Sequence, residues 1–217
     1  MIFLLRDPSQ RKPLYFLKAY CSGILRGNRL NRLLKNLKSL EELKVPLIKP
    51  IHTIFKNPVL SYLRGEFFYG YAVYEYLEKG FLREEDFISS NRPNFALLHE
   101  LVGFLYELHE RGILLRDTKF NNFYYTEEEG FKVFDLDGVE ITQRSPSLRE
   151  RLEDLAPLAM TLEWIGFSEA SKEIFRKYQW LYPHLGDEYI SYFLKLVNER
   201  ELKRFKKLRK EKTIENL

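Results

Sequence analysis

A short polar loop, residues 115–122, constrains this chain more than any other feature of its sequence. It places a carboxylate at Asp117, an ammonium at Lys119 and a carboxamide at Asn122. In phosphoryl transfer, a carboxylate accepts the proton of a substrate hydroxyl, and an amide oxygen helps to hold Mg²⁺ against the nucleotide phosphates. The spacing therefore favours a phosphoryl-transfer site. A polar loop without chemistry is the alternative that it leaves open.

A second carboxylate, Asp135, follows the loop at the end of a predicted β-hairpin. Residues 123–125 and 131–134 are rich in aromatic residues, and the polar stretch 126–130 between them ends in glycine. This pattern is typical of two antiparallel strands joined by a turn. We expect the hairpin to fold Asp135 back beside Asn122, so that the two side chains share a metal ion.

Together, the loop and the hairpin resemble the protein-kinase signature H-R-D-x-K-x-x-N followed by D-F-G. They are more similar to the bacterial lipopolysaccharide-core sugar kinases, the Kdo and heptose kinase family. Members of that family commonly carry an Asp-x-Asp version of the metal motif, here Asp135-Leu136-Asp137. Asp154-Leu155 resembles the start of a further helix motif of the family. The resemblance covers residues 13–165 and is most specific over 112–139.

The resemblance implies an α+β fold, with two lobes as in protein kinases. Residues 1–80 would form a small nucleotide-binding lobe with a reduced antiparallel sheet. Residues 81–217 would form a mainly helical lobe that carries the catalytic loop and the metal motif.

The resemblance also implies roles for individual residues. Asp117 would be the base or would orient the hydroxyl, and Lys119 would stabilise the charge on the transferring phosphoryl group. Asn122 and Asp135 would bind Mg²⁺, and Lys18 would contact the α and β phosphates of ATP.

Three further residues are assigned to adenine binding by their position alone. Glu75, Tyr76 and Leu77 lie at the end of the predicted strand 67–76 and would form the hinge between the lobes. Adenine would bind there through backbone N–H and C=O groups. For Asp137 two roles stay open: it would contact the metal ion or the substrate, or it would only cap a turn.

Two departures from the kinase pattern concern the surroundings of Lys18. Residues 1–17 contain no glycine, so no glycine-rich loop precedes this lysine, and no acidic residue lies between it and Glu41. The helix position where kinases place a glutamate corresponds to Leu33. Lys18 would then pair with Asp135, with Glu41 or Glu42, or with the nucleotide only.

Hydrophobic periodicity predicts the remaining elements. Pro93 is expected early in its helix, Ser168 as an N-cap and Pro157 as a kink or break. His99 and His109, ten residues apart on one helix, are expected to be structural. The predicted strands are 1–5, 13–20, 51–55 and 67–76, and the predicted helices are 29–43, 93–111, 148–164, 168–181 and 187–209.

Composition favours a soluble cytoplasmic protein. The chain has one cysteine, Cys21, which fits a reducing compartment. Arg6 interrupts the first apolar run too early for a signal peptide. No apolar run approaches the ~18 residues that span a bilayer.

Lysine and arginine gather in two segments, residues 18–44 and 199–212. Basic segments meet phosphates of nucleotides or of an anionic membrane face. For the C-terminal segment, peripheral contact with the inner membrane and a simply solvated helix face both stay open. No nucleic-acid partner is expected.

The expected function is an ATP-dependent kinase of a sugar hydroxyl in the lipopolysaccharide inner core, on Kdo or heptose, with ATP and Mg²⁺ as cofactors. No long activation segment and no Ala-Pro-Glu motif follow Asp137, which argues against a kinase that docks peptides. An atypical small protein kinase, a small-molecule kinase and a catalytically weak pseudokinase stay open as alternatives.

Overall fold

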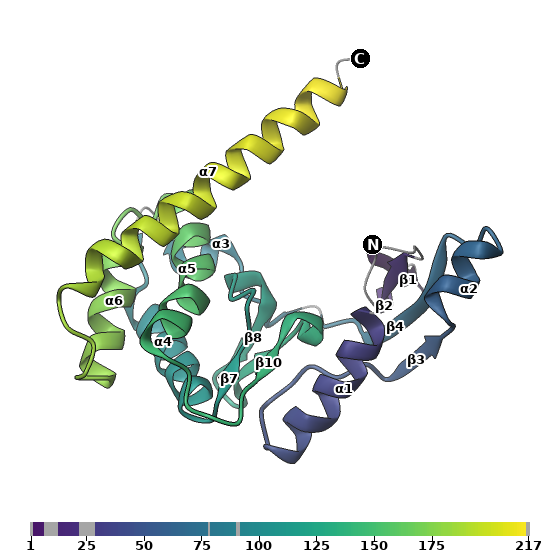
Figure 1. The fold of residues 1–217 in the computed structure, drawn as a ribbon, viewed down its shortest axis with the longest axis horizontal. Helices are drawn as coiled ribbons and strands as arrows, with labels where there is room; N and C mark the ends of the chain where they lie inside the picture. The colour runs from purple at the N-terminus through teal and green to yellow at the C-terminus, as the bar shows by residue number, and fades with distance from the viewer. Residues whose placement is uncertain (1, 7–12, 22–28, 78, 90–91, 216–217) are drawn as a thin grey trace. The chain divides into compact units, whose positions relative to one another are not determined.

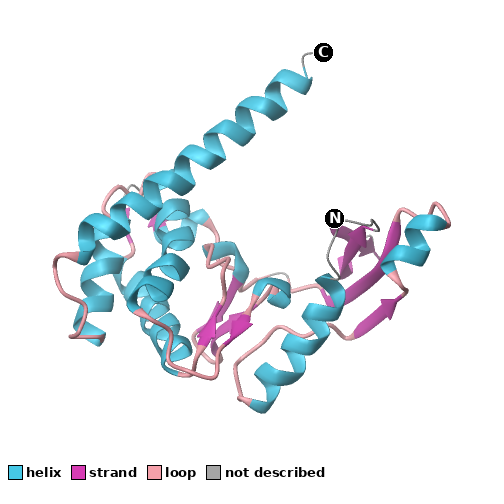
Figure 2. Cartoon of the chain, viewed as in Figure 1, coloured by secondary structure: helices cyan, strands magenta, loops and turns pink. Residues whose placement is uncertain are grey.

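The chain has a mixed α+β fold, with an antiparallel four-stranded sheet and several helices (Figure 2). The computed structural model describes residues 2–6, 13–21, 29–77, 79–89 and 92–215. Its contacts divide the chain into two compact units. The first contains Met1–Phe81 and Phe123–Gly138, and the second contains Leu82–Asn122 and Val139–Leu217.

The sheet of the first unit has the strand order β1-β2-β4-β3, with every neighbour antiparallel (Figure 1). Its strands match the sequence prediction to within about one residue at each end. They are β1 (Ile2–Arg6), β2 (Pro13–Cys21), β3 (His52–Phe55) and β4 (Phe68–Glu75). In the register of β2 and β4, Phe16 lies opposite Tyr74 and Lys18 lies opposite Ala72. Opposite residues of paired strands share a face of the sheet, and so do residues two apart in one strand. Lys18 therefore lies on the same side of the sheet as the buried rings of Phe16 and Tyr74.

Helix α1 (Arg29–Glu42) completes the core of the first unit. Leu30, Leu33 and Leu40 are fully buried, at the spacing expected for one face of a helix. Its first turn is fixed to the sheet because the backbone N–H of Leu30 donates to the Tyr69 hydroxyl at 3.0 Å.

The predicted hairpin is present as β8 (Phe123–Thr126) and β9 (Gly130–Val133). Although we expected it within the helical lobe, its contacts group it with the first unit. The reason is a set of backbone bonds to the linker after α1. Val133 donates to the Pro46 carbonyl at 3.0 Å, and Ile48 donates to the Val133 carbonyl at 2.9 Å. A 3-10 turn, η2 (Leu136–Gly138), follows the hairpin.

A short helix, α2 (Pro58–Leu63), joins β3 to β4 and was not predicted. Asn57 caps it, because its side chain accepts hydrogen bonds from the N–H groups of Val59 and Leu60. Pro58 occupies the first turn, where its missing N–H costs nothing.

The second unit is mostly helical. Helix α4 packs on α6, and α5 packs on both α6 and α7. The helices are α3 (Glu84–Phe87), α4 (Phe95–Glu110), α5 (Leu148–Trp164), α6 (Ala170–Leu181) and α7 (Tyr189–Glu215). Two short antiparallel pairs and a 3-10 turn complete it: β5 (Ile88–Ser89) with β6 (Arg92–Pro93), β7 (Ile113–Leu114) with β10 (Glu140–Ile141), and η1 (Phe120–Asn122).

Two predicted helix starts were wrong. Pro93 lies in β6, ahead of α4, and Asn94 caps the helix by accepting from the N–H of Leu97. Ser168 is not the cap of α6, because residues 167–169 form a turn in which the N–H of Ala170 donates to the Phe167 carbonyl.

Pro157 does not split α5, which runs unbroken from Leu148 to Trp164. A proline leaves the carbonyl four residues earlier without its helical donor. Here that carbonyl belongs to Glu153, and Arg200 of α7 donates to it at 3.1 Å. Helix α7 extends six residues beyond the predicted end at 209.

Among the described residues, none of the helices combines the length and the apolar character needed to cross a bilayer.

Candidate functional site

The loop between β7 and η1 holds the predicted catalytic pair. The ammonium of Lys119 lies 2.9 Å from one carboxylate oxygen of Asp117 and 3.1 Å from the other. Both side chains are about two-fifths exposed, at 39% and 45%. The amide of Asn122 donates to the backbone carbonyl of Asp117 at 2.8 Å, which closes the loop on itself. The structure therefore brings all three residues of this predicted set together.

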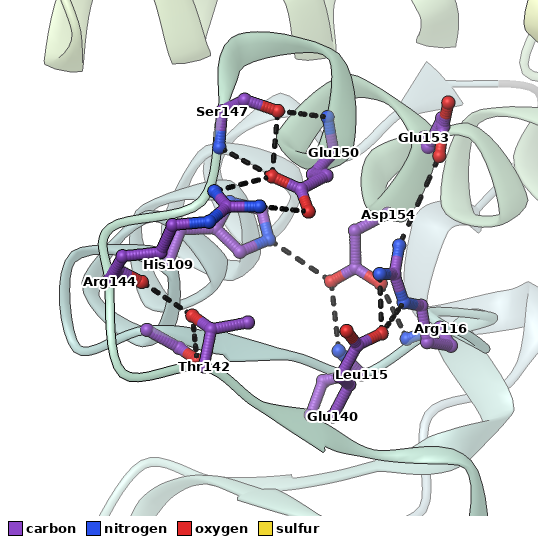
Figure 3. A network of polar contacts seen from close by, with 11 residues as sticks. His109, Leu115, Arg116, Glu140, Thr142, Arg144, Ser147, Glu150, Glu153 and Asp154 are labelled. Atoms are coloured by element: carbon purple, nitrogen blue, oxygen red, sulfur yellow. Dashed lines mark hydrogen bonds and ion pairs between the residues drawn. The ribbon is translucent and has the colours of Figure 1, made fainter.

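A buried carboxylate, Asp154 of α5, fixes the backbone of this loop (Figure 3). One of its oxygens accepts from the N–H of Arg116 at 2.5 Å, and the other accepts from the N–H of Leu115 at 3.0 Å. The hydroxyl of Thr118 donates to the backbone carbonyl of Asp154. Arg116 has a positive φ of 65°. Non-glycine residues adopt that conformation only where their surroundings impose it, and such positions cluster at functional sites.

His109 supports Asp154 from behind. One ring nitrogen lies 3.0 Å from the Asp154 carboxylate, and the other lies 2.6 Å from the Tyr178 hydroxyl. All three side chains are buried. Burial raises the pKa of Tyr178 above its ordinary value, so the hydroxyl stays neutral. These contacts agree with the structural role predicted for His109.

The side chain of Arg116 ties the loop to β10. It donates to the carboxylate of Glu140 at 2.9 and 2.5 Å and lies 4.0 Å from Glu153 (Figure 3). At the start of α5, Ser147 and Glu150 bond reciprocally in a helix cap. Hydrogen bonds from Arg144 and Ser147 lower the pKa of Glu150 from 4.5 to about 2.

In the first unit, Lys18 and Asp135 form an ion pair. The ammonium of Lys18 lies 2.5 Å from a carboxylate oxygen of Asp135, and the side chains are 10% and 25% exposed. This is the first of the three partners predicted for Lys18. The ammonium also lies over the rings of Tyr20 and Phe134, 5.5 and 5.9 Å from their centres. Asp135 has a positive φ of 64°.

Helix α1 contacts the predicted metal motif through the amide of Asn36, which sequence reasoning missed. Asn36 donates to the backbone carbonyl of Leu136 at 2.8 Å. Leu33, at the helix position where kinases place a glutamate, is fully buried in the core. A single asparagine within a helix has no distinctive sequence pattern, so only the structure reveals this contact.

The predicted hinge residues are the last residue of β4, Glu75, and the two residues that follow it. The N–H of Tyr76 donates to the Leu14 carbonyl at 2.9 Å, which extends the pairing with β2 by one bond. Glu75 and Leu77 line an open cavity of about 330 Å³ in the first unit. Lys18 and Asp135 do not line it. Its other lining residues are Leu47, Ile48, Lys49, Ile51, Tyr124, Glu129 and Lys132.

The predicted site residues divide between the two units. Asp117, Lys119 and Asn122 belong to the second, whereas Lys18, Asp135 and the hinge residues belong to the first.

The donor atoms of the predicted metal ligands suit Mg²⁺. Asp135 offers carboxylate oxygens. Asn122 uses its amide N–H on the Asp117 carbonyl, so its side-chain oxygen is the remaining acceptor. Such hard oxygen donors are the ligands that Mg²⁺ prefers. The side chain of Asp137 lies outside the described part of the chain.

The chain matches no protein-family model and no curated protein.

Proposed function

We propose that this chain is an ATP-dependent phosphotransferase with a protein-kinase-like, two-lobed fold. The acceptor we propose is a sugar hydroxyl, on Kdo or heptose of the lipopolysaccharide inner core. The observation that carries the proposal is the ion pair between Lys18 and Asp135. A lysine that is nine-tenths buried in an apolar strand needs an anionic partner, and nucleotide phosphates supply one during binding.

The loop residues supply the second half of the argument. Asp117 is exposed enough to meet an acceptor, and its carboxylate would accept the hydroxyl proton. Lys119, held at 2.9 Å from that carboxylate, places a positive charge where the phosphoryl group would pass. Asn122 and Asp135 would hold Mg²⁺, which neutralises charge on the phosphates. Because this chemistry depends on positioning, a loop fixed by the buried Asp154 is the support that it requires.

A catalytically weak pseudokinase is the second candidate. The missing glycine-rich loop and the absence of a glutamate at Leu33 favour it. In that case nucleotide would bind at Lys18, and the phosphoryl group would not be transferred.

A panel of acceptors tests the proposal. Purified protein is incubated with Mg²⁺ and γ-labelled ATP, together with Kdo-lipid A, a heptosylated acceptor, a free aminoglycoside or a generic peptide. We expect label on one of the two lipopolysaccharide acceptors. Label on the peptide would identify an atypical protein kinase, and label on the aminoglycoside would identify a small-molecule kinase. Binding of Mg·ATP without transfer to any acceptor would identify a pseudokinase.

A further inference from the structure

We propose that the connection between β3 and β4, residues 54–67, is a docking tip that inserts apolar side chains into the surface of an anionic lipid bilayer. We call this segment the β3–β4 tip. The inference does not depend on phosphoryl transfer, because it concerns a surface that shares no residue with Lys18, Asp135 or the catalytic loop.

The burial pattern of α2 within the tip is inverted. Ser61 is only 2% exposed, whereas Val59, Leu60, Tyr62 and Leu63 are 44%, 51%, 49% and 69% exposed. A helix on the surface of a soluble unit normally buries its large apolar residues and exposes its polar ones. The reverse arrangement places four large apolar side chains in water. Contiguous exposed apolar surface of this kind marks an interaction site.

Three more exposed apolar residues extend the patch on either side of α2. Ile54 and Phe55 end β3, and Phe67 precedes β4; they are 46%, 43% and 64% exposed. Successive residues of a strand point to opposite faces of its sheet. Ile54 and Phe55 therefore carry the apolar surface onto both faces of the sheet end.

An ion pair and backbone hydrogen bonds join the parts of the tip. Lys56 pairs with Glu66 at 3.0 Å across the two ends of the segment. The N–H of Lys56 donates to the Tyr69 carbonyl, and the N–H of Glu66 donates to the Ser61 carbonyl. The apolar side chains are thus presented on a preformed support, which lowers the entropic cost of binding.

The distribution of these side chains favours a bilayer over a protein partner. A protein partner would cover one face, whereas the exposed residues here occupy a wide arc of α2 and both faces of the sheet end. A lipid surface surrounds an inserted tip on all sides. Tyr62 suits the headgroup boundary, where amphipathic rings gather. Lys56 and Arg64 flank the apolar residues against one carboxylate, Glu66, so the tip keeps a net positive charge. Cations beside an apolar surface favour anionic headgroups.

Vesicle binding of the full chain tests the inference. We would measure flotation with vesicles of phosphatidylglycerol and phosphatidylethanolamine, and with vesicles of phosphatidylcholine alone, without any sugar acceptor. The test variant is Leu60→Ser with Leu63→Ser. The control is Trp180→Ser, which removes an apolar residue that is 72% exposed on α6. Circular dichroism and the melting temperature check that each variant folds.

We expect the wild type to float with the anionic vesicles and more weakly with phosphatidylcholine. Each leucine lost should lower the partition coefficient by about tenfold, while the control binds as the wild type does. Wild-type binding by the double variant would overturn the inference and would assign any contact to another surface, such as the basic part of α7. Absence of vesicle binding, with self-association that the double variant abolishes, would also overturn it.

Discussion

The carboxylate of Asp154 accepts a hydrogen bond from the backbone N–H of Arg116, with the two atoms 2.5 Å apart. This contact joins residues 38 positions apart and holds Arg116 at its positive φ. It sets the direction in which the side chain of the next residue, Asp117, projects from the backbone. The first prediction concerns this bond.

Asp154→Asn should destabilise the chain and reduce its activity. The carboxylate accepts from two backbone N–H groups, and an amide can accept on one side only, so one buried donor loses its partner. We expect a loss of about 1–3 kcal/mol in the free energy of unfolding, measured by urea denaturation. Glu188→Gln, at an exposed position, is the control and should change stability by less than about 0.5 kcal/mol. An unchanged unfolding midpoint for Asp154→Asn would show that the loop is held by other contacts.

The second prediction separates nucleotide binding from general stability. Mg·ATP should raise the melting temperature of the wild type, because a ligand that binds only the folded state stabilises it. Lys18→Met and Asp135→Ala should each abolish that increase. Lys56→Met is the matched control, since Lys56 also forms an ion pair, with Glu66 at 3.0 Å, but at an exposed position away from the cavity that Glu75 and Leu77 line. A full nucleotide-dependent shift in both test variants would contradict the assignment.

The third prediction concerns Asn36 as a positioning residue. Asn36→Ala removes the donor to the Leu136 carbonyl and should cost about 1 kcal/mol of stability. Because η2 directly follows Asp135, we also expect turnover to fall more than the apparent affinity for ATP. Asn31→Ala, at an exposed position on the same helix, is the control. Equal effects of the two substitutions on turnover would argue that the Asn36 contact is only structural.

The fourth prediction is a pH dependence that arises from Glu150. Its pKa is lowered from 4.5 to about 2 in the folded chain, so the folded state favours the ionised carboxylate. The stability that it contributes is therefore present above pH 4.5 and is lost as the pH falls toward 2. Melting curves of the wild type and Glu150→Gln should differ at neutral pH and converge in acid. A difference that stays constant down to pH 2 would contradict this assignment.

Sequence patterns that lie within a single helix or hairpin predicted its structure well. Helix α5 has the bounds that its apolar periodicity indicated, and the hairpin formed between the two aromatic runs. The local arrangement of Asp117, Lys119 and Asn122 also followed from spacing, because all three lie within six residues of one loop.

The features that sequence reasoning missed depend on tertiary contacts. Helix α2 has no apolar period to detect, since its serine is buried and its leucines are exposed. The bond from Asn36 to the Leu136 carbonyl, in the predicted metal motif, joins residues 100 positions apart. The start of α6 depends on a turn around the buried Phe167, which makes Ser168 an ordinary turn residue.

The most direct test of the central claim is the turnover of an Asp117→Ala variant with Mg·ATP and the acceptor that the wild type phosphorylates. Removing a general base lowers the rate by about 10²–10⁴-fold, and we expect a loss in that range with the melting temperature and ATP binding nearly unchanged. Glu85→Gln, which removes a carboxylate at an exposed position on α3, should retain wild-type turnover. Full phosphoryl transfer by Asp117→Ala would contradict the proposed phosphotransferase site.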